Sequence, residues 1–237
     1  MRFQNCIFDL YGTLADIRTD EDAPELWTAM TDCYARLGAC YSPAGLRLAF
    51  RRGVAEAERE AVRRGVPGGW PEIRYETVFR RLFREKGVDV SLEQAARVGM
   101  RFRKLSRVDI RLYDGAAELL KTLREKGCGV WLLSNAQRIF TAGELDGLGL
   151  TPLFDGICLS SDYGVKKPDW RFFHALLYRQ RILPETAVMT GDDSLCDIQG
   201  AKAAGLSAVC VHSDSLPEGA SFAAKDLREA LEFLAGE

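Results

Sequence analysis

Two kinds of hydrophobic pattern divide this chain of 237 residues. A short, continuous apolar run at Cys6–Leu10 is typical of a strand that is buried on both faces. Between Asp16 and Arg107 no comparable run occurs, and the apolar residues recur with the three- and four-residue spacing of helices. We therefore predict one strand near the start of the chain, followed by a long helical segment.

Start signals support four helices in this segment. Ser42 precedes Pro43, which is typical of an N-cap followed by a first-turn proline, and Ser91 with Gln94 has the spacing of a capping box. The four predicted helices cover approximately Ala23–Leu37, Pro43–Arg64, Pro71–Lys86 and Ser91–Ser106.

After Asp109, short apolar runs alternate with amphipathic helical patterns. Strands separated by helices of this length require crossover connections, so we expect a mainly parallel sheet with helices on both faces. The predicted fold class is α/β: residues 1–14 and 109–237 form a doubly wound sheet, and residues 15–108 are inserted as a helical domain. The predicted strands after Asp109 are Gly129–Ser134, Gly156–Ser160, Ala187–Asp192 and Ser207–His212.

The composition narrows the function classes. Hydrophobic residues make up 47% of the chain and charged residues 28%, which is ordinary for a globular protein, and no apolar run reaches the roughly 20 residues of a membrane helix. The net charge of -2 and the lack of a basic run argue against nucleic-acid binding. The seven cysteines are scattered without a CxxC pair, so neither a zinc site nor a disulfide framework is predicted. With no signal-peptide pattern at the start of the sequence, we expect a cytoplasmic monomer or homodimer that binds neither nucleic acid nor membrane.

Polar residues follow four of the predicted strands. Because ligands of doubly wound sheets bind beyond the carboxyl ends of the strands, these side chains are expected to meet at one edge. An aspartate there acts as a nucleophile, and paired carboxylates bind a hard cation such as Mg²⁺. Hydroxyl and ammonium groups hold phosphoryl oxygens, so the set suits phosphoryl transfer. The candidates are Asp9, Thr13, Ser134, Asn135, Lys166, Lys167, Asp192, Asp193 and Asp197.

Four short motifs carry a resemblance to a known family. The stretches "DLYGT", "LLSN", "KKPD" and "GDDSLCD" resemble, in order, the four motifs of the haloacid dehalogenase (HAD) superfamily of hydrolases. The resemblance implies a Rossmann-like core with an inserted four-helix cap. It further implies a magnesium-dependent phosphatase that acts on a small phosphorylated metabolite through an aspartyl-phosphate on Asp9.

The resemblance also implies roles for the candidate residues. Asp9 and Lys167 are the implied catalytic residues, with Tyr11 at the position of the usual proton-transfer group. Thr13, Ser134, Asn135 and Lys167 are implied to position the phosphoryl group. The implied magnesium ligands are Asp9, the backbone carbonyl of Tyr11 and Asp192, with Asp193 and Asp197 supporting the ion directly or through water.

Tyr11 is the main departure from the phosphatase pattern. Phosphatases of this superfamily usually carry Asp-x-Asp, whereas a tyrosine with a pKa of about 10 is a poor base near neutral pH. The 2-haloacid dehalogenases carry Asp-x-Tyr-Gly-Thr, which this sequence matches. Their fourth motif, however, resembles Ser-Ser-Asn-x-x-Asp, and Phe173 and Cys40 stand near the places of their tyrosine and arginine. Phosphonatases also lack the second aspartate but need a cap lysine, and no lysine occurs between Thr13 and Lys86.

The fourth motif favours the phosphatase interpretation, because additional carboxylates beside a carboxylate nucleophile are unfavourable unless a cation lies among them. Two alternatives stay open: dehalogenase-type hydrolysis through an aspartyl ester, and a metabolite-binding protein with low turnover. The group that replaces the missing proton-transfer acid is not identified by the sequence; a cap residue or a substrate with a good leaving group would serve.

The inserted segment offers two further interpretations. Residues 15–108 hold 18 Lys and Arg against 14 Asp and Glu, and a basic cap would favour anionic substrates. Alternatively these arginines only solvate helix faces, as the spacing of Glu56 with Arg59 and of Glu60 with Arg64 suggests. The Gly- and Pro-rich stretch around Trp70 is expected to be either a loop over the site or a plug between cap helices.

Overall fold

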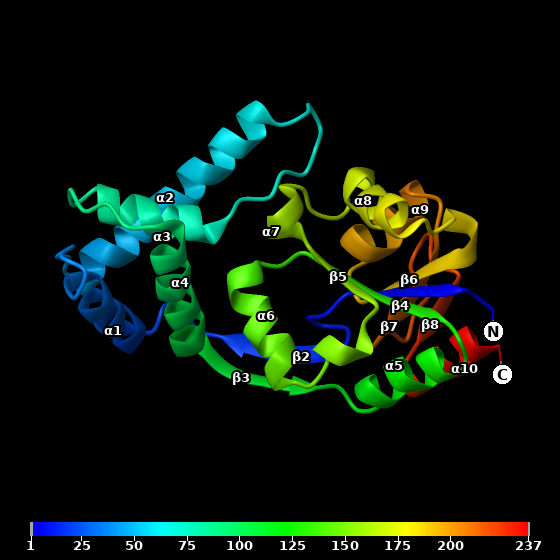
Figure 1. Ribbon diagram of the computed structural model, residues 1–237. Coiled ribbons are helices and arrows are strands. Elements are labelled where there is room, and N and C mark those ends of the chain that lie inside the picture. The colour runs from blue at the N-terminus through cyan, green and yellow to red at the C-terminus, as the bar shows by residue number, and fades with distance from the viewer. Residues whose placement is uncertain (1, 237) are drawn as a thin grey trace.

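The structure, a computed structural model, describes residues 2–236 (Figure 1). Six parallel strands form one sheet in the order β5-β4-β1-β6-β7-β8. The mainly parallel sheet predicted from the sequence is therefore confirmed, and its first strand lies between two strands from the second part of the chain. The strands are β1 (Asn5–Phe8), β4 (Gly129–Ser134), β5 (Gly156–Leu159), β6 (Ala187–Gly191), β7 (Ser207–Val211) and β8 (Phe222–Ala224).

Helices cover both faces of this sheet. Cys6 and Phe8 belong to one buried cluster, which they share with leucines of α5 and α10, whereas Ile7 belongs to a second cluster with residues of α8 and α9. Figure 1 shows the two helix pairs on opposite sides of the strands. Burial on both faces explains why β1 is a continuous apolar run. The helices and turns of this part are α5 (Ala116–Glu125), α6 (Arg138–Gly147), a turn at Thr151–Leu153, α7 (Ser160–Tyr163), α8 (Trp170–Gln180), a turn at Pro184–Thr186, a π-helical turn at Ser194–Gln199, α9 (Gly200–Ala203) and α10 (Leu227–Ala235).

Four helices precede the second part of the chain, as predicted: α1 (Pro24–Ala35), α2 (Pro43–Arg64), α3 (Tyr75–Arg84) and α4 (Leu92–Ser106). The Ser42 side chain accepts a hydrogen bond from the Gly45 N–H, and Ser91 forms the expected capping box with Gln94. Helix α3 begins four residues later than predicted, because Pro71 pairs with Val165 in an isolated bridge. These helices enclose an aromatic core whose buried rings include Trp27, Phe50, Phe79 and Phe102.

A two-stranded antiparallel ribbon connects the helices to the large sheet. It consists of β2 (Ala15–Thr19) and β3 (Arg107–Leu112), so the prediction that no strand lies between Asp16 and Arg107 is wrong. The sequence of β2 is Ala-Asp-Ile-Arg-Thr, and its last two residues are exposed, so it has no apolar run. Strand β2 begins at the first predicted boundary of the inserted domain and β3 crosses the second, and the division of the chain into two domains stays a prediction. Within residues 2–236, no helix has both the length and the apolar character needed to cross a bilayer.

Candidate active site

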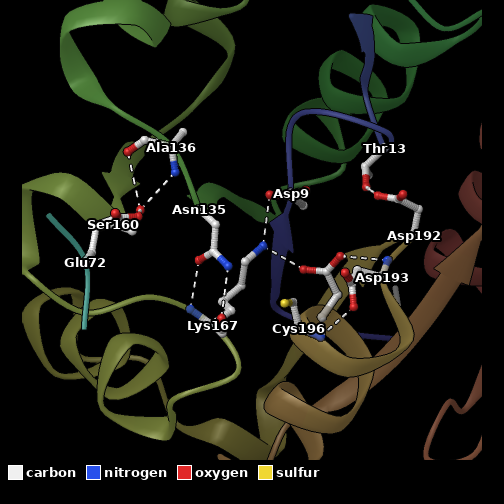
Figure 2. A network of polar contacts seen from close by, with 11 residues as sticks. Asp9, Thr13, Glu72, Asn135, Ala136, Ser160, Lys167, Asp192, Asp193 and Cys196 are labelled. Atoms are coloured by element: carbon white, nitrogen blue, oxygen red, sulfur yellow. Dashed lines mark hydrogen bonds and ion pairs between the residues drawn. The ribbon is translucent and has the colours of Figure 1, made fainter. Parts of the chain in front are cut away.

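The candidate residues meet beyond the carboxyl ends of three neighbouring strands (Figure 2). Phe8 of β1 is in register with Leu132 of β4 and with Thr190 of β6, so all three strands end at the same edge. Each of these strands is followed directly by a polar residue: Asp9, Asn135 and Asp192. Lys167 reaches the same place from the loop before α8. Thr13 and Ser134 are buried at this edge as well.

Lys167 is the centre of the polar network. Its side chain is buried, and its Nζ donates to Asp9 Oδ1 at 2.9 Å and to Asp197 Oδ1 at 2.6 Å. The Asn135 side chain fixes the backbone of Lys167 through two hydrogen bonds, of 2.9 Å to the carbonyl and 2.8 Å from the N–H. Burial disfavours the ammonium ion, but the charges of Asp197 and Asp9 outweigh it and raise the pKa of Lys167. The lysine is therefore a cation beside Asp9 at neutral pH.

Three carboxylates stand close to this lysine. Asp9, Asp192 and Asp197 each offer one oxygen, and these oxygens all lie within 4.8 Å of one another. Asp192 Oδ1 also accepts a hydrogen bond from the Thr13 hydroxyl at 2.9 Å. Partial burial and the charge of Asp9 raise the pKa of Asp192, in spite of the bond from Thr13. One lysine faces three carboxylates, which favours a further cation among them.

Two glycines allow these carboxylates to approach the backbone. Gly12 has a φ of +82°, and a Cβ atom there would lie 2.4 Å from Asp192 Oδ2. A Cβ atom on Gly191 would lie 2.2 Å from Asp197 Oδ2. Any side chain at either position would displace a carboxylate. Steric exclusion therefore explains why glycine stands in the first motif at Gly12 and in the fourth at Gly191.

Asp193 lies outside the three-carboxylate group. Its Oδ1 accepts hydrogen bonds from the backbone N–H groups of Leu195 at 2.8 Å and Cys196 at 2.7 Å, so the side chain caps the π-helical turn. The N–H of Asp193 donates to Asp197 Oδ2 at 3.1 Å. The geometry thus gives the Asp193 carboxylate the role of a helix cap, and its expected support of a metal stays a prediction.

The Tyr11 hydroxyl binds residues of helix α6. It donates to the Glu144 carboxylate and shares a 3.0 Å hydrogen bond with the Thr141 hydroxyl. Burial and the neighbouring Glu144 raise the pKa of Tyr11, which strengthens the expectation that this residue is no general base near neutral pH. Glu144 and Thr141 were not among the residues predicted from the sequence, because no motif marks them and they stand more than 100 residues away.

Glu144 also connects the helical segment to this site. It is buried, and it accepts hydrogen bonds from Arg103 Nε at 2.8 Å and Nη2 at 3.3 Å, and from Arg107 at 3.3 Å. Arg103 comes from α4, so one carboxylate holds α4, the ribbon and Tyr11 together. Bidentate pairing of this kind restrains both partners in direction as well as distance.

A cavity of about 550 Å³ opens over Lys167 and Asn135. Trp70 and Tyr75 line it from the helical segment. The Trp70 N–H donates to Asp169 Oδ2 at 3.1 Å, and its carbonyl accepts from the Lys166 N–H at 2.9 Å. The stretch around Trp70 is thus tied to the loop that carries Lys167, which favours the interpretation of a loop over the site.

The fold has several solved counterparts. A 2-haloacid dehalogenase from Pseudomonas syringae pv. Tomato DC3000 aligns over 99% of both chains with a TM-score of 0.69 and 22% identity. A HAD hydrolase from Bacillus subtilis bound to magnesium aligns over 99% of this chain and 100% of that chain, with a TM-score of 0.58 and 19% identity. At these identities the similarity establishes the fold alone.

Sequence comparison adds relatives of named activity. The phosphoserine phosphatase of Thermus thermophilus is 34% identical over 152 residues, which are 62% of this chain and 61% of that protein. The phosphoglycolate phosphatase of Pseudomonas putida is 29% identical over 203 residues, 86% of this chain and 67% of that protein. The chain therefore spans less than two thirds of the length of the phosphoserine phosphatase. The family model of haloacid dehalogenase-like hydrolases matches residues 3–205, and this protein belongs to that family of hydrolases.

Proposed function

We propose that this protein is a magnesium-dependent phosphatase that acts on a small phosphorylated metabolite. The observation that carries the proposal is the group of three carboxylates around the buried Lys167. Its ammonium group is bound to two of them, Asp9 and Asp197. An anionic nucleophile attacks an anionic phosphate ester only where cations offset their repulsion. The phosphoserine and phosphoglycolate phosphatases among the relatives support a phosphorylated substrate.

The carboxylates fit a magnesium ion. Oxygen ligands lie about 2.1 Å from Mg²⁺, so two ligands of one ion are at most about 4.2 Å apart, close to the 4.8 Å limit of this group. Asp9, Asp192 and the Tyr11 carbonyl would hold the ion, and Asp197 would support it through water because Lys167 and the Asp193 N–H already occupy both of its oxygens. When bound, magnesium supplies positive charge at the phosphoryl oxygens.

Asp9 is the proposed nucleophile. Its Oδ1 accepts from Lys167, which leaves Oδ2 to form a bond to phosphorus while the bond from phosphorus to the ester oxygen breaks. Thr13, Ser134 and Asn135 position the phosphoryl group, and the Lys167 ammonium offsets its charge. Water then attacks phosphorus and releases phosphate from Asp9. Tyr11 keeps its proton, so the departing alkoxide takes its proton from another group or leaves as a good leaving group.

Dehalogenase-type hydrolysis is the second candidate, and the tyrosine of "DLYGT" favours it. In that reaction Asp9 attacks carbon and halide leaves. Phe173, which stands near the tyrosine of those enzymes, is fully buried in the cluster beneath α8 and cannot contact a substrate without rearrangement. The phosphatase proposal is therefore preferred.

A substrate panel tests the proposal. Phosphate release and halide release are measured over phosphate monoesters and 2-haloacids, each with Mg²⁺ and with EDTA. We expect phosphate release that EDTA abolishes and that Asp9→Asn lacks. Halide release that persists in EDTA, without phosphate release, overturns the proposal. If neither product appears but a phosphate ester raises the melting temperature, the low-turnover binding protein is the better description.

A further inference from the structure

Three glutamates of the helical segment form an acidic wall of the cavity. Glu21 precedes α1, Glu58 belongs to α2 and Glu72 lies before α3, and all three line the cavity together with Tyr75. Burial, followed by the charges of Glu21, Glu58 and Glu72, raises the pKa of the Tyr75 phenol to about 12. Because Coulomb interactions weaken with distance, this shift agrees with three carboxylates gathered around one ring.

The acidic wall belongs to a segment in which basic residues outnumber acidic ones. Residues 15–108 hold 18 basic and 14 acidic residues, and most carboxylates there have arginine partners: Glu56 pairs with Arg81, Glu60 with Arg64 and Glu85 with Arg52. The expected pairing of Glu60 is confirmed, whereas Glu56 pairs with Arg81 and not with Arg59. These pairs support the view that the arginines solvate helix faces.

Glu21 and Glu58 are exposed at the cavity and form no ion pair with any residue from 2 to 236, although the charges of Arg103 and Arg51 act on Glu21 from a distance. Glu72 accepts hydrogen bonds from the Ser160 hydroxyl at 2.7 Å and from the Ile73 N–H at 2.9 Å, and neither donor is charged. No cation of the described chain therefore neutralises these three carboxylates through a direct ion pair. Where a cavity wall keeps such charges, a cationic ligand group gains the attraction.

Positive charge also lines the cavity. Lys166 and Lys167 come from the loop before α8 and line the cavity next to Asn135. The remaining guanidinium at the cavity, that of Arg103, is bound to the buried Glu144. The cavity therefore carries both signs of charge: lysines lie where the phosphoryl group is proposed to bind, and three carboxylates without an ion pair among the described residues come from the helical segment.

We propose that the preferred substrate is a phosphate monoester whose leaving alcohol carries an ammonium group. This inference rests on the proposed phosphatase function and names the substrate class for the same site. The phosphoryl group binds at Lys167 and Asp9, and the ammonium group faces Glu21, Glu58 and Glu72. The exposed ring of Trp70 and the ring of Tyr75 offer further faces to a cation. A basic cap selecting anionic leaving groups is the opposite expectation, and the paired arginines do not support it.

Matched substrates test the inference. O-Phosphoethanolamine carries the ammonium group, propyl phosphate replaces it with a methyl group, and phosphoglycolate carries a carboxylate. We expect kcat/KM for phosphoethanolamine to exceed that for propyl phosphate at least tenfold, and phosphoglycolate to be the poorest of the three. Equal values for the first two, or a preference for phosphoglycolate, overturn the inference.

Variants locate the effect. Glu21→Gln with Glu58→Gln should reduce the preference for phosphoethanolamine over propyl phosphate to less than threefold. Glu60→Gln, on the same helix as Glu58 but paired with Arg64, should keep the full preference. If the double variant keeps the preference as well, the acidic wall does not produce it.

Failure of the inference and failure of the proposed function give different results. Magnesium-dependent release of phosphate from p-nitrophenyl phosphate without an amine preference leaves the phosphatase proposal in place and refutes the acidic wall as a determinant. If no ester is hydrolysed, titration calorimetry of the Asp9→Asn protein with phosphoethanolamine and propyl phosphate still decides the inference. Tighter binding of the amine supports it, and equal or absent binding of both refutes it.

Discussion

Tyr11 directs its hydroxyl group to Glu144 and Thr141 on α6. Its raised pKa keeps the phenol protonated near neutral pH, so it cannot accept a proton from water, and its proton is already donated to Glu144. At the residue scale, the protein thus uses this position to connect the first motif to α6. Proton transfer to the leaving group is the step that has no assigned residue.

Tyr11→Asp supplies the missing acid, and we expect it to raise magnesium-dependent phosphatase kcat at least about tenfold, since a positioned general acid or base contributes roughly 10²- to 10⁴-fold. Steady-state phosphate release measures the change. Tyr11→Phe is the control, because it removes the same hydroxyl without adding a carboxylate, and it should give no increase. A folded, magnesium-binding Tyr11→Asp protein without higher turnover would show that Tyr11 has a positive role.

Lys167 is a buried cation between two carboxylates. Lys167→Met leaves Asp9 and Asp197 without their partner, and breaking such a buried pair costs about 3–5 kcal/mol of unfolding free energy. We expect phosphate release to be lost as well. Urea denaturation measures the stability. Lys166→Met is the matched control and should change stability by less than about 1 kcal/mol, because its side chain forms no ion pair with the described residues. A similar loss of unfolding free energy in both variants would contradict the view that Lys167 stabilises the fold through its two ion pairs.

The stability contributed by Lys167 depends on pH in a defined direction. Because its pKa is higher in the folded protein than the ordinary value of about 10.4, the folded state holds this proton more tightly than the unfolded state. The contribution is complete below about pH 10 and is lost as the pH rises through the folded-state pKa. We therefore expect the stability difference between wild type and Lys167→Met to shrink above about pH 10 in denaturation curves. A difference that stays constant or grows over this range would be inconsistent with a raised pKa.

At the scale of elements, one side chain at the start of α6 makes two of the hydrogen bonds that attach the segment between α2 and α3 to the rest of the chain. Gln137 Nε2 donates to the Ile73 carbonyl at 2.9 Å, and Gln137 Oε1 accepts from the Tyr75 N–H at 3.0 Å. These two bonds hold Tyr75 at the cavity. Loss of the side chain would loosen the end of the segment that carries Tyr75 to the cavity, while the contacts of Trp70 and Glu72 remain.

Gln137→Ala should therefore raise KM for a phosphate ester about three- to tenfold and cost about 1–2 kcal/mol of stability, the typical worth of two hydrogen bonds. Initial-rate kinetics and thermal denaturation measure both quantities. Gln199→Ala, at an exposed position, is the control and should change neither. If Gln137→Ala lowers stability but leaves KM unchanged, the segment does not contribute to substrate binding.

Predictability also differed between elements for a physical reason. Strand β4 and helix α2 have the bounds predicted from the sequence, because a doubly buried strand and a capped amphipathic helix leave strong local patterns. The ribbon strands β2 and β3 and the three-residue β8 were not predicted. The burial of β2 and β3 is incomplete, and they pair with each other across 87 residues of intervening chain, so no local pattern marks them.

At the scale of the whole molecule, magnesium binding should couple to folding, because Asp9 and Asp192 come together only in the folded chain. At a concentration 100 times its dissociation constant, a ligand of the folded state adds about 2.7 kcal/mol. For a chain of this length this corresponds to roughly 5–10 °C in melting temperature. Differential scanning fluorimetry with and without Mg²⁺ measures the shift.

Two adjacent aspartates provide the matched pair for this test. Asp192→Asn should abolish the magnesium-dependent shift, whereas Asp193→Asn should keep it, because the Asp193 carboxylate already accepts two backbone N–H groups. The Asp193 variant should lower the melting temperature in both conditions through its weakened cap. The reverse result, with the shift lost only in the Asp193 variant, would place that residue in the metal site.

The amino-acid order alone was sufficient for the parallel sheet, the four helices and the family, because strand and helix periodicity and the four motifs are local properties. The sequence was also sufficient to predict which residues gather at one edge of the sheet, since parallel strands bring their carboxyl ends together. The sequence alone did not determine the direction of individual side chains or their partners in distant segments. The contact of Tyr11 with Glu144, the gathering of Glu21 and Glu58 at one cavity, and the ribbon depend on which distant segments pack together. Such contacts follow from the burial of whole surfaces and not from any stretch of sequence.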